Sequence, residues 1–177
     1  MDLTVIVPTF NEGPNVAELV RRVGASLRGR SFEILFVDDS TDNTPDLIRQ
    51  AADAADFPVR LIHRDNPTAG LGGAVVDGFH AADSRWCLVM DGDLQHPPEL
   101  LPKLMDAVTR DADVAVASRY VAEGGEVAGL DGRGDSDGAR QRARALVGRG
   151  RQSPDALRRY QPFENRSRRP GDRPLRH

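Results

Sequence analysis

The sequence has little of several features that define whole classes of protein. It contains one cysteine, Cys87, one lysine, Lys103, and only 5% aromatic residues in a chain of 177. A single cysteine excludes an internal disulfide and a cysteine-based zinc site. No apolar run approaches the roughly 20 residues of a membrane-spanning helix, and the N-terminus lacks the basic start and cleavage site of a signal peptide. We therefore expect one soluble domain with a cytoplasmic location.

Charge and hydropathy both change near Asp131. The net charge is -3, but residues 1–130 carry 11 Lys and Arg against 21 Asp and Glu, whereas residues 131–177 carry 13 Arg against 6 acids. Hydrophobic residues fall from 45% before this point to 10 of 47 residues after it. We expect residues 1–130 to build the fold and residues 131–177 to form an Arg- and Gly-rich tail, with at most a short helix over 139–147. Tyr160 and Phe163 are the only aromatic residues of the tail, and no nucleic-acid-binding fold surrounds them, so no nucleic-acid partner is expected.

Hydrophobic periodicity in the first 130 residues alternates between two patterns. Short apolar runs predict strands at residues 3–7, 34–37, 59–62, 86–90 and 114–117. Apolar residues at helical spacing predict helices over 14–27, 44–55, 71–82 and 97–108, with Thr44 as an N-cap. Near-continuous apolar strands alternating with helices indicate an α/β fold, in which a mostly parallel sheet has helices on both faces. Ligands bind such sheets at the carboxyl ends of the strands.

An acidic pair directly follows the fourth predicted strand. Asp91 and Asp93 offer two hard oxygen ligands at the sheet edge, and Gln95 adds a neutral carbonyl oxygen. Mg²⁺ and Mn²⁺ prefer such ligands and complete their shell with phosphate oxygens and water, which indicates a diphosphate ligand. The alternative is a tight turn, because Asp and Gly are common turn formers. His63, His80 and His96 lack zinc-ligand spacing and are interpreted as structural.

Two other strand ends carry candidate ligand-binding carboxylates. The Asp38-Asp39 pair after the second strand can accept hydrogen bonds from a nucleobase or ribose, or it forms a solvated turn. Glu12, after the first strand, either faces a sugar hydroxyl or favours the positive start of the next helix. The glycines of residues 70–73 lack the spacing of a phosphate-binding loop and indicate instead a close-packed entry to the third helix.

Five segments, in order, carry a resemblance to a known family: VIVPTFNE, EILFVDDSTDNT, GLGGA, VMDGDLQHPPE and ASRYV. Over residues 3–130 the chain resembles the family 2 glycosyltransferases of the GT-A, Rossmann-like fold, and within them the polyprenyl-phosphate (dolichol-phosphate) mannose synthases. The resemblance implies an inverting, Mg²⁺- or Mn²⁺-dependent transfer of mannose from GDP-mannose to a polyprenyl phosphate at the cytoplasmic membrane face. It is compatible with a membrane-protein tether. A family 2 transferase with another donor, such as UDP-glucose, and a non-catalytic remnant that binds a nucleotide sugar stay open as alternatives.

The resemblance also implies roles for individual residues. It assigns nucleotide-sugar contacts to the loop after the first strand, to the end of the second and to the turn after the fourth, namely to Pro8, Phe10, Glu12, Val37, Asp39, Asp91 and Gly92. Many relatives have Tyr at position 10 and Ala at position 92. The metal ligands implied are Asp91, Asp93 and Gln95, and the catalytic residues are Asp93 and Arg119, the latter beside the reacting phosphates.

The resemblance ends where the composition changes. Relatives continue with amphipathic helices and with a segment that closes the acceptor side, and this sequence has neither. We therefore expect a complete donor half and a truncated C-terminal part, in which residues 131–177 are disordered or read out of frame. The alternative is an authentic basic tail that binds anionic lipid headgroups.

Overall fold

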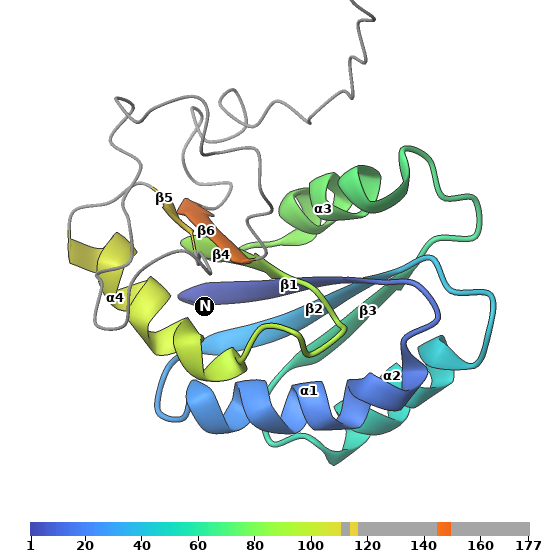
Figure 1. The fold of residues 1–177 in the computed structure, drawn as a ribbon, viewed down its shortest axis with the longest axis horizontal. Helices are drawn as coiled ribbons and strands as arrows, with labels where there is room; N and C mark the ends of the chain where they lie inside the picture. The colour runs from blue at the N-terminus through green and yellow to red at the C-terminus, as the bar shows by residue number, and fades with distance from the viewer. Residues whose placement is uncertain (111–113, 117–144, 150–177) are drawn as a thin grey trace, which may run out of the picture.

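A six-stranded sheet forms the centre of the fold in the computed structural model, which describes residues 1–110, 114–116 and 145–149 (Figure 1). The strands are β1 (Leu3–Thr9), β2 (Phe32–Asp38), β3 (Val59–His63), β4 (Trp86–Met90), β5 (Val114–Val116) and β6 (Ala145–Arg149). Their order across the sheet is β3-β2-β1-β4-β6-β5. The first four strands in this order are parallel, while β6 is antiparallel to both of its neighbours.

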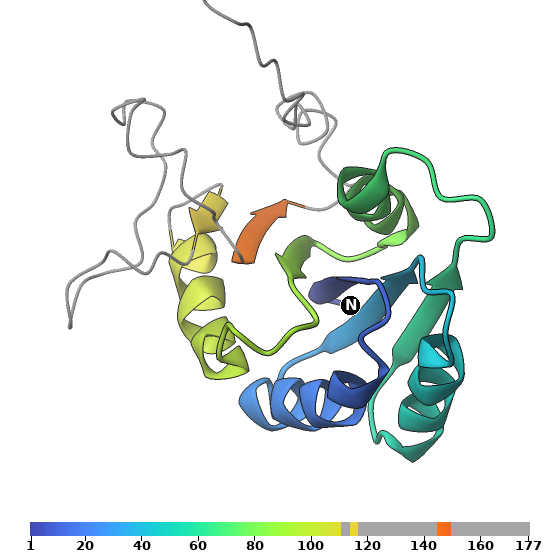
Figure 2. The same ribbon diagram turned by 45° about the vertical axis from the view of Figure 1, so that its right-hand side comes forward.

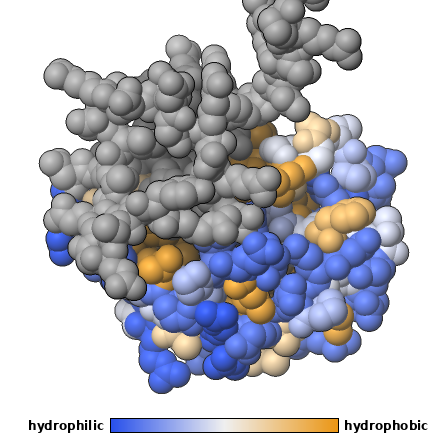
Figure 3. Space-filling model, viewed as in Figure 1, coloured by the Kyte–Doolittle hydropathy of each residue, from blue (hydrophilic) through white to orange (hydrophobic). Residues whose placement is uncertain are grey.

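Helices cover both faces of the sheet (Figure 2). They are α1 (Gly13–Ser26), α2 (Thr44–Ala54), α3 (Gly70–Ala81), the 3₁₀ turn η1 (Pro98–Leu100) and α4 (Leu101–Arg110). The helices α1, α2 and α4 share one face, and α3 covers the other. The outer surface over α1 and α2 is mainly hydrophilic (Figure 3), as expected for helices with one apolar face. No helix in the described ranges is both long enough and apolar enough to cross a membrane.

Alternation along β1 supplies both layers of the core. Val5 and Val7 pack with the apolar face of α1, whereas Ile6 packs with α3 residues such as Ala74. All three β1 side chains are fully buried. Burial of an aliphatic side chain contributes about 1.5–3 kcal/mol to the free energy of folding. Both layers therefore stabilise the sheet, and with it the strand ends at which the site lies. On the α1 side the expected helical set is buried as a group: Val16, Leu19, Val20, Val23 and Leu27.

The predicted α/β architecture is confirmed, with differences at the ends of the elements. β1 and β2 continue to Thr9 and Asp38 because these polar residues pair with each other across the two strands. The helix expected over 97–108 begins as η1 and continues as α4. Thr44 is not the N-cap of α2 but its first residue, and its hydroxyl accepts a hydrogen bond from the main-chain N–H of Gly13, 2.9 Å away, at the start of α1.

The strand β6 corrects one expectation about the tail. The short helix expected over 139–147 is wrong at 145–147, because these residues begin a strand that pairs with β4 and β5. The first 130 residues alone therefore do not build the sheet. Residues 139–144 and the predicted boundary near Asp131 lie outside the described residues.

Candidate functional site

The loops after β1 and β2 are joined by hydrogen bonds at the carboxyl edge of the sheet. The main-chain N–H of Asp39 donates to the carbonyl of Thr9 at 3.0 Å, and that of Asn11 donates to the hydroxyl of Ser40 at 2.8 Å. The Asn11 side chain makes a second link between the loops, since its Oδ1 accepts a hydrogen bond from the N–H of Thr41 at 3.0 Å. Asn11 has a φ of 55°, a left-handed conformation that asparagine tolerates better than most residues. The first two strand ends therefore form one unit.

Asp38 is part of the framework of this unit. Its side chain is fully buried and accepts hydrogen bonds from the hydroxyls of Thr9, at 2.8 Å, and Ser40, at 2.5 Å. The main-chain N–H of Ser40 lies 3.2 Å from Asp38 Oδ2, and Nδ1 of His63 lies 2.8 Å from the same oxygen. These contacts explain why a carboxylate is tolerated at the end of a buried strand. Of the two aspartates at the end of β2, Asp38 therefore has no exposed surface with which to meet a ligand.

Asp39 forms a two-pronged ion pair with Arg64, which follows β3. Arg64 Nε donates to one carboxylate oxygen at 2.6 Å and Nη2 to the other at 2.5 Å. The same guanidinium donates to Asp77 of α3 at 2.9 Å and to the carbonyl of Gly70 at 3.0 Å. Both side chains are almost buried, and the Asp39 carboxylate raises the pKa of Arg64. Arg64 thus fixes Asp39 against α3, while carboxylate lone pairs remain to accept from a hydroxyl or an N–H.

The turn after β4 brings together three side chains that can bind a metal. One ligand atom from each of Asp91, Asp93 and His96 lies within 4.8 Å of the others. Asp93 Oδ1 also accepts from the main-chain N–H of Gln95 at 3.0 Å, and Leu94 between them has a φ of 58°. A left-handed leucine is a strained conformation, of the kind that concentrates at ligand sites. His96 is the member of this cluster that sequence reasoning missed, although its place three residues after Asp93 in the same turn was a usable signal.

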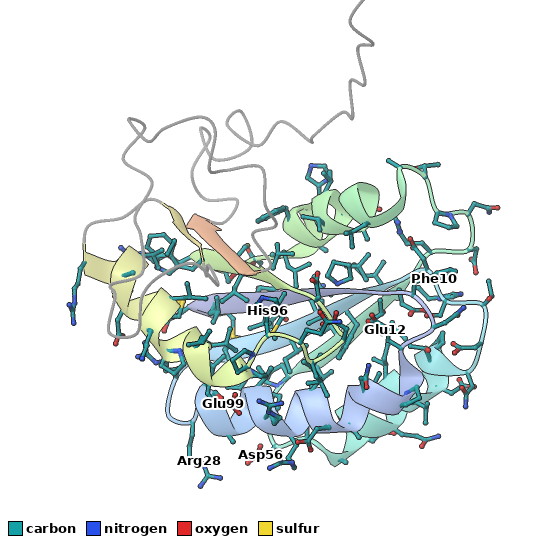
Figure 4. All side chains as sticks on the ribbon, in the orientation of Figure 1. Phe10, Glu12, Arg28, Asp56, His96 and Glu99 are labelled. Carbon is teal, nitrogen blue, oxygen red and sulfur yellow. The ribbon has the colours of Figure 1, made fainter. Side chains whose placement is uncertain are left out.

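Glu12, on the neighbouring loop after β1, extends the acidic cluster. Figure 4 labels Phe10 and Glu12 on the loop after β1, and His96 on the loop after β4. Among the described residues, Glu12 Oε2 is buried without a hydrogen-bond partner. Burial, followed by the charges of Asp93, Asp91 and Asp38, raises the pKa of Glu12 to about 7. A site with this much uncompensated negative charge favours a cation.

Gly92 provides the space that Glu12 occupies. A Cβ atom at position 92 would collide with Glu12 Oε2, and it would lie 3.2 Å from Cγ2 of Thr9. The close approach therefore depends on the absence of a side chain at 92. Together with the carboxylates and the imidazole of the turn, the unpartnered Glu12 oxygen fits a divalent cation with oxygen-rich coordination, Mg²⁺ or Mn²⁺.

The remaining predicted residues fall into three groups. Pro8 and Val37 pair across β1 and β2 and are buried, with Val37 packed in the α3 layer of the core. Phe10 is 62% exposed on the loop after β1, and Gln95 is exposed beside the metal-binding turn. Arg119 lies outside the described residues. The structure therefore brings Glu12, Gly92 and the Asp91–Asp93 pair together at one edge, with Asp39 held by Arg64 on the joined loops.

Comparisons with known proteins identify a family model and relatives that match this chain. The family model described as "Glycosyl transferase family 2" matches residues 4–166. The chain is 43% identical over 128 residues to a dolichol-phosphate mannosyltransferase of Pyrococcus furiosus, covering 72% of this chain and 35% of the relative. It is 42% identical over 124 residues to a polyprenol monophosphomannose synthase of Mycolicibacterium smegmatis, covering 68% and 46%. An undecaprenyl-phosphate 4-deoxy-4-formamido-L-arabinose transferase of Pseudomonas paraeruginosa is 34% identical over 120 residues, covering 66% and 35%.

A solved structure shares the fold. The mannosyltransferase PcManGT from Pyrobaculum calidifontis, in complex with GDP-Man and Mn²⁺, superposes with a TM-score of 0.56 at 27% identity, covering 67% of this chain and 35% of that one. The fold and its sheet are thus those of GT-A glycosyltransferases. The chain spans between about a third and a half of the length of the relatives it matches.

Proposed function

Because the chain belongs to glycosyl transferase family 2, we propose that it carries the donor-binding half of a polyprenyl-phosphate mannose synthase. The reaction proposed is the transfer of mannose from GDP-mannose to a polyprenyl phosphate, with inversion at the anomeric carbon. The observation that carries the proposal is the cluster of Asp91, Asp93 and His96 at the carboxyl end of β4, facing Glu12 of the neighbouring loop. Two of the relatives described above are named for mannose transfer to dolichol phosphate or polyprenol phosphate, and the PcManGT structure contains GDP-Man and Mn²⁺.

The proposed division of work follows from the chemistry of the side chains. Asp91, Asp93 and His96 would hold the cation, with Gln95 as a further oxygen ligand. A divalent cation bound there supplies Lewis-acid stabilisation of the charge that develops on the leaving diphosphate. Asp39, held by Arg64, would accept hydrogen bonds from the base or ribose, and Pro8, Phe10, Glu12 and the main chain at Val37 would complete the nucleotide contacts.

The acceptor requires little activation from the protein. A polyprenyl phosphate is already anionic at pH 7, so its attack on the anomeric carbon needs little help from a general base. Inversion follows from a single in-line displacement, by analogy with inverting glycoside chemistry. The proposed role of Arg119 is to offset repulsion between donor and acceptor phosphates, for which a planar guanidinium is suited. The lipid acceptor places the proposed enzyme at a membrane surface, where a membrane-protein partner is one means of attachment.

A second candidate is a family 2 transferase that uses another nucleotide sugar. The observation in its favour is the 34% identity to the arabinose-derivative transferase, whose name also contains a polyprenyl phosphate. The two candidates share the acidic turn after β4 and differ in the base and sugar of the donor. A non-catalytic chain that binds a nucleotide sugar is a third candidate, which shares the acidic turn after β4 and differs in giving donor binding without transfer.

Calorimetric titration of the 177-residue chain distinguishes these candidates. GDP, GDP-mannose, UDP and UDP-glucose are titrated with Mn²⁺ and with a chelator, and mannose transfer to a polyprenyl phosphate is measured on the same sample. Mn²⁺-dependent binding of GDP with transfer supports the proposed synthase. Preference for UDP supports the second candidate, and GDP binding without transfer supports the third. Absence of binding by every nucleotide contradicts the proposed donor site.

A further inference from the structure

The absence of a side chain at position 92 has a steric explanation. Gly92 is buried in the turn between Asp91 and Asp93, and a Cβ atom there would overlap Glu12 Oε2. The φ angle of Gly92 is not in the left-handed region, so its backbone conformation is open to other residues. Alanine at 92 therefore requires the Glu12 carboxylate, which is the end of a flexible side chain, to move from its present position.

Glu12 holds this position against an electrostatic cost. Among the described residues its Oε2 has no hydrogen-bond partner, and its nearest charges include the carboxylates of Asp91 and Asp93. An unpartnered buried oxygen beside like charges destabilises the protein unless a ligand compensates it. The arrangement thus places a third carboxylate against a metal-binding pair, and the missing side chain at 92 is what permits it.

We infer that Gly92 is a positioning residue for Glu12, and that Glu12, held against the Asp91–Asp93 turn, sets how strongly nucleotide binding depends on a divalent cation. The inference rests on the proposed nucleotide-diphosphate site. A third carboxylate increases the repulsion that a cation-free diphosphate meets, and it increases the attraction for a divalent cation. Both effects enlarge the same quantity, the ratio of GDP dissociation constants without and with Mn²⁺.

The experiment is a double-mutant cycle measured by calorimetry at pH 8 on the full chain. GDP is titrated with Mn²⁺ and with a chelator into the wild type, Gly92→Ala, Glu12→Ala and the double variant. We expect Gly92→Ala and Glu12→Ala each to lower the ratio about tenfold, the equivalent of about 1.4 kcal/mol. The double variant is expected to match Glu12→Ala, because Gly92 acts through Glu12.

Two further variants guard against effects on folding. Gly72→Ala on α3 is the matched control, since its Cβ position has nothing within 4 Å, and it is expected to keep the wild-type ratio. Glu12→Asp withdraws the carboxylate by one methylene and leaves Gly92 in place. If Gly92→Ala does not fold, as judged by circular dichroism, a fall in the ratio for Glu12→Asp supports the inference and an unchanged ratio overturns it.

The outcomes separate this inference from the proposed function. An unchanged ratio in Gly92→Ala overturns the inference, and so does an equal loss on adding Gly92→Ala to the Glu12→Ala background. Either result leaves the proposed donor site standing if the wild type binds GDP with Mn²⁺. If the wild type binds no GDP, the proposed function fails. Titration of Mn²⁺ alone then tests the part of the inference that does not involve GDP, the effect of Gly92 and Glu12 on cation binding: weaker Mn²⁺ binding in Gly92→Ala supports it, and equal binding overturns it.

Discussion

The carboxylates at the end of β2 and those around the turn after β4 lie in opposite environments. Asp38 and Asp39 meet hydroxyl, main-chain and guanidinium donors at 2.5–3.2 Å. Glu12 instead faces Asp91 and Asp93, and its pKa is raised to about 7. Groups that the protein itself compensates stabilise the fold, whereas groups that repel one another remain available for a ligand of opposite charge. Substitutions in the first region should therefore reduce stability, and substitutions in the second should reduce binding.

The largest effect on stability is expected for Asp38→Ala. The substitution leaves the buried hydroxyl donors of Thr9 and Ser40, and the partly exposed imidazole of His63, without their acceptor, which should lower the free energy of unfolding by about 3 kcal/mol. Urea denaturation followed by circular dichroism measures the change. Asp46→Ala on the exposed side of α2 is the control and should stay within about 0.5 kcal/mol of the wild type. Equal stability of the two variants would contradict the framework role of Asp38.

Asp93→Ala should reduce ligand binding without reducing stability, the reverse of the effect expected for Asp38→Ala. Loss of a ligand from the cluster should weaken Mn²⁺-dependent GDP binding by more than about 100-fold, since even indirect partners of metal ligands contribute 10–100-fold. Stability at pH 8 should not fall, because a charge that repels Glu12 has been removed. Calorimetry and urea denaturation on one preparation measure both quantities. Retained Mn²⁺ dependence would remove Asp93 from the proposed metal site.

Arg64→Lys tests how far the compensated region depends on geometry as well as charge. Lysine keeps the positive charge but cannot donate to both oxygens of Asp39 while contacting Asp77. We expect a loss of about 1.5 kcal/mol in unfolding free energy, measured in urea. The exposed Arg49→Lys is the matched control and should be neutral. A neutral Arg64→Lys would show that charge alone suffices at this position.

The smallest expected effect is a pH-dependent gain in the stability of Glu12→Gln over the wild type. The pKa of Glu12 rises from 4.5 to about 7 on folding, so the folded state keeps a proton that the unfolded state releases between these values. Wild-type stability therefore falls as pH rises from 4.5 to 7, and Glu12→Gln lacks this loss. The variant should match the wild type near pH 4.5 and exceed it at pH 8, by about 1 kcal/mol because partial exposure screens the repulsion. A stability difference that does not change with pH would contradict the raised pKa.

Local patterns were sufficient to predict most of the fold. The apolar run Trp86–Met90 is a strand with the predicted bounds, and the helical spacing from Val16 to Val23 forms the buried face of α1, with Leu27 buried directly after the helix. β6 was not predicted, because its five residues lie in an Arg-rich background and their pairing with β4 is distant in sequence. Such pairing leaves no periodic signal of useful length.

The candidate site was predictable where chemistry is contiguous in sequence. Asp91 and Asp93 are two residues apart in one turn, so their proximity can be predicted from the sequence alone. The spacing of the histidines gives no signal for His96, because its partners in the cluster are the carboxylates of Asp91 and Asp93. The link between Asp39 and Arg64, and the contact between Glu12 and Gly92, join different loops and depend on side-chain positions that only the folded chain defines. The roles implied for all of the site residues, Val37, Gln95 and Arg119 among them, remain predictions.

The position of β6 has a consequence for synthesis of the chain. β6 lies between β4 and β5 and is antiparallel to both, so β4 gains its second neighbour only from residues 145–149. While the ribosome adds the residues between β4 and β6, the main-chain hydrogen-bonding groups on one side of β4 lack the strand that pairs with them in the complete sheet. An open strand edge is a template for another chain. A nascent chain halted in this interval would be at risk of edge-to-edge association, and release of residues 145–149 ends that exposure.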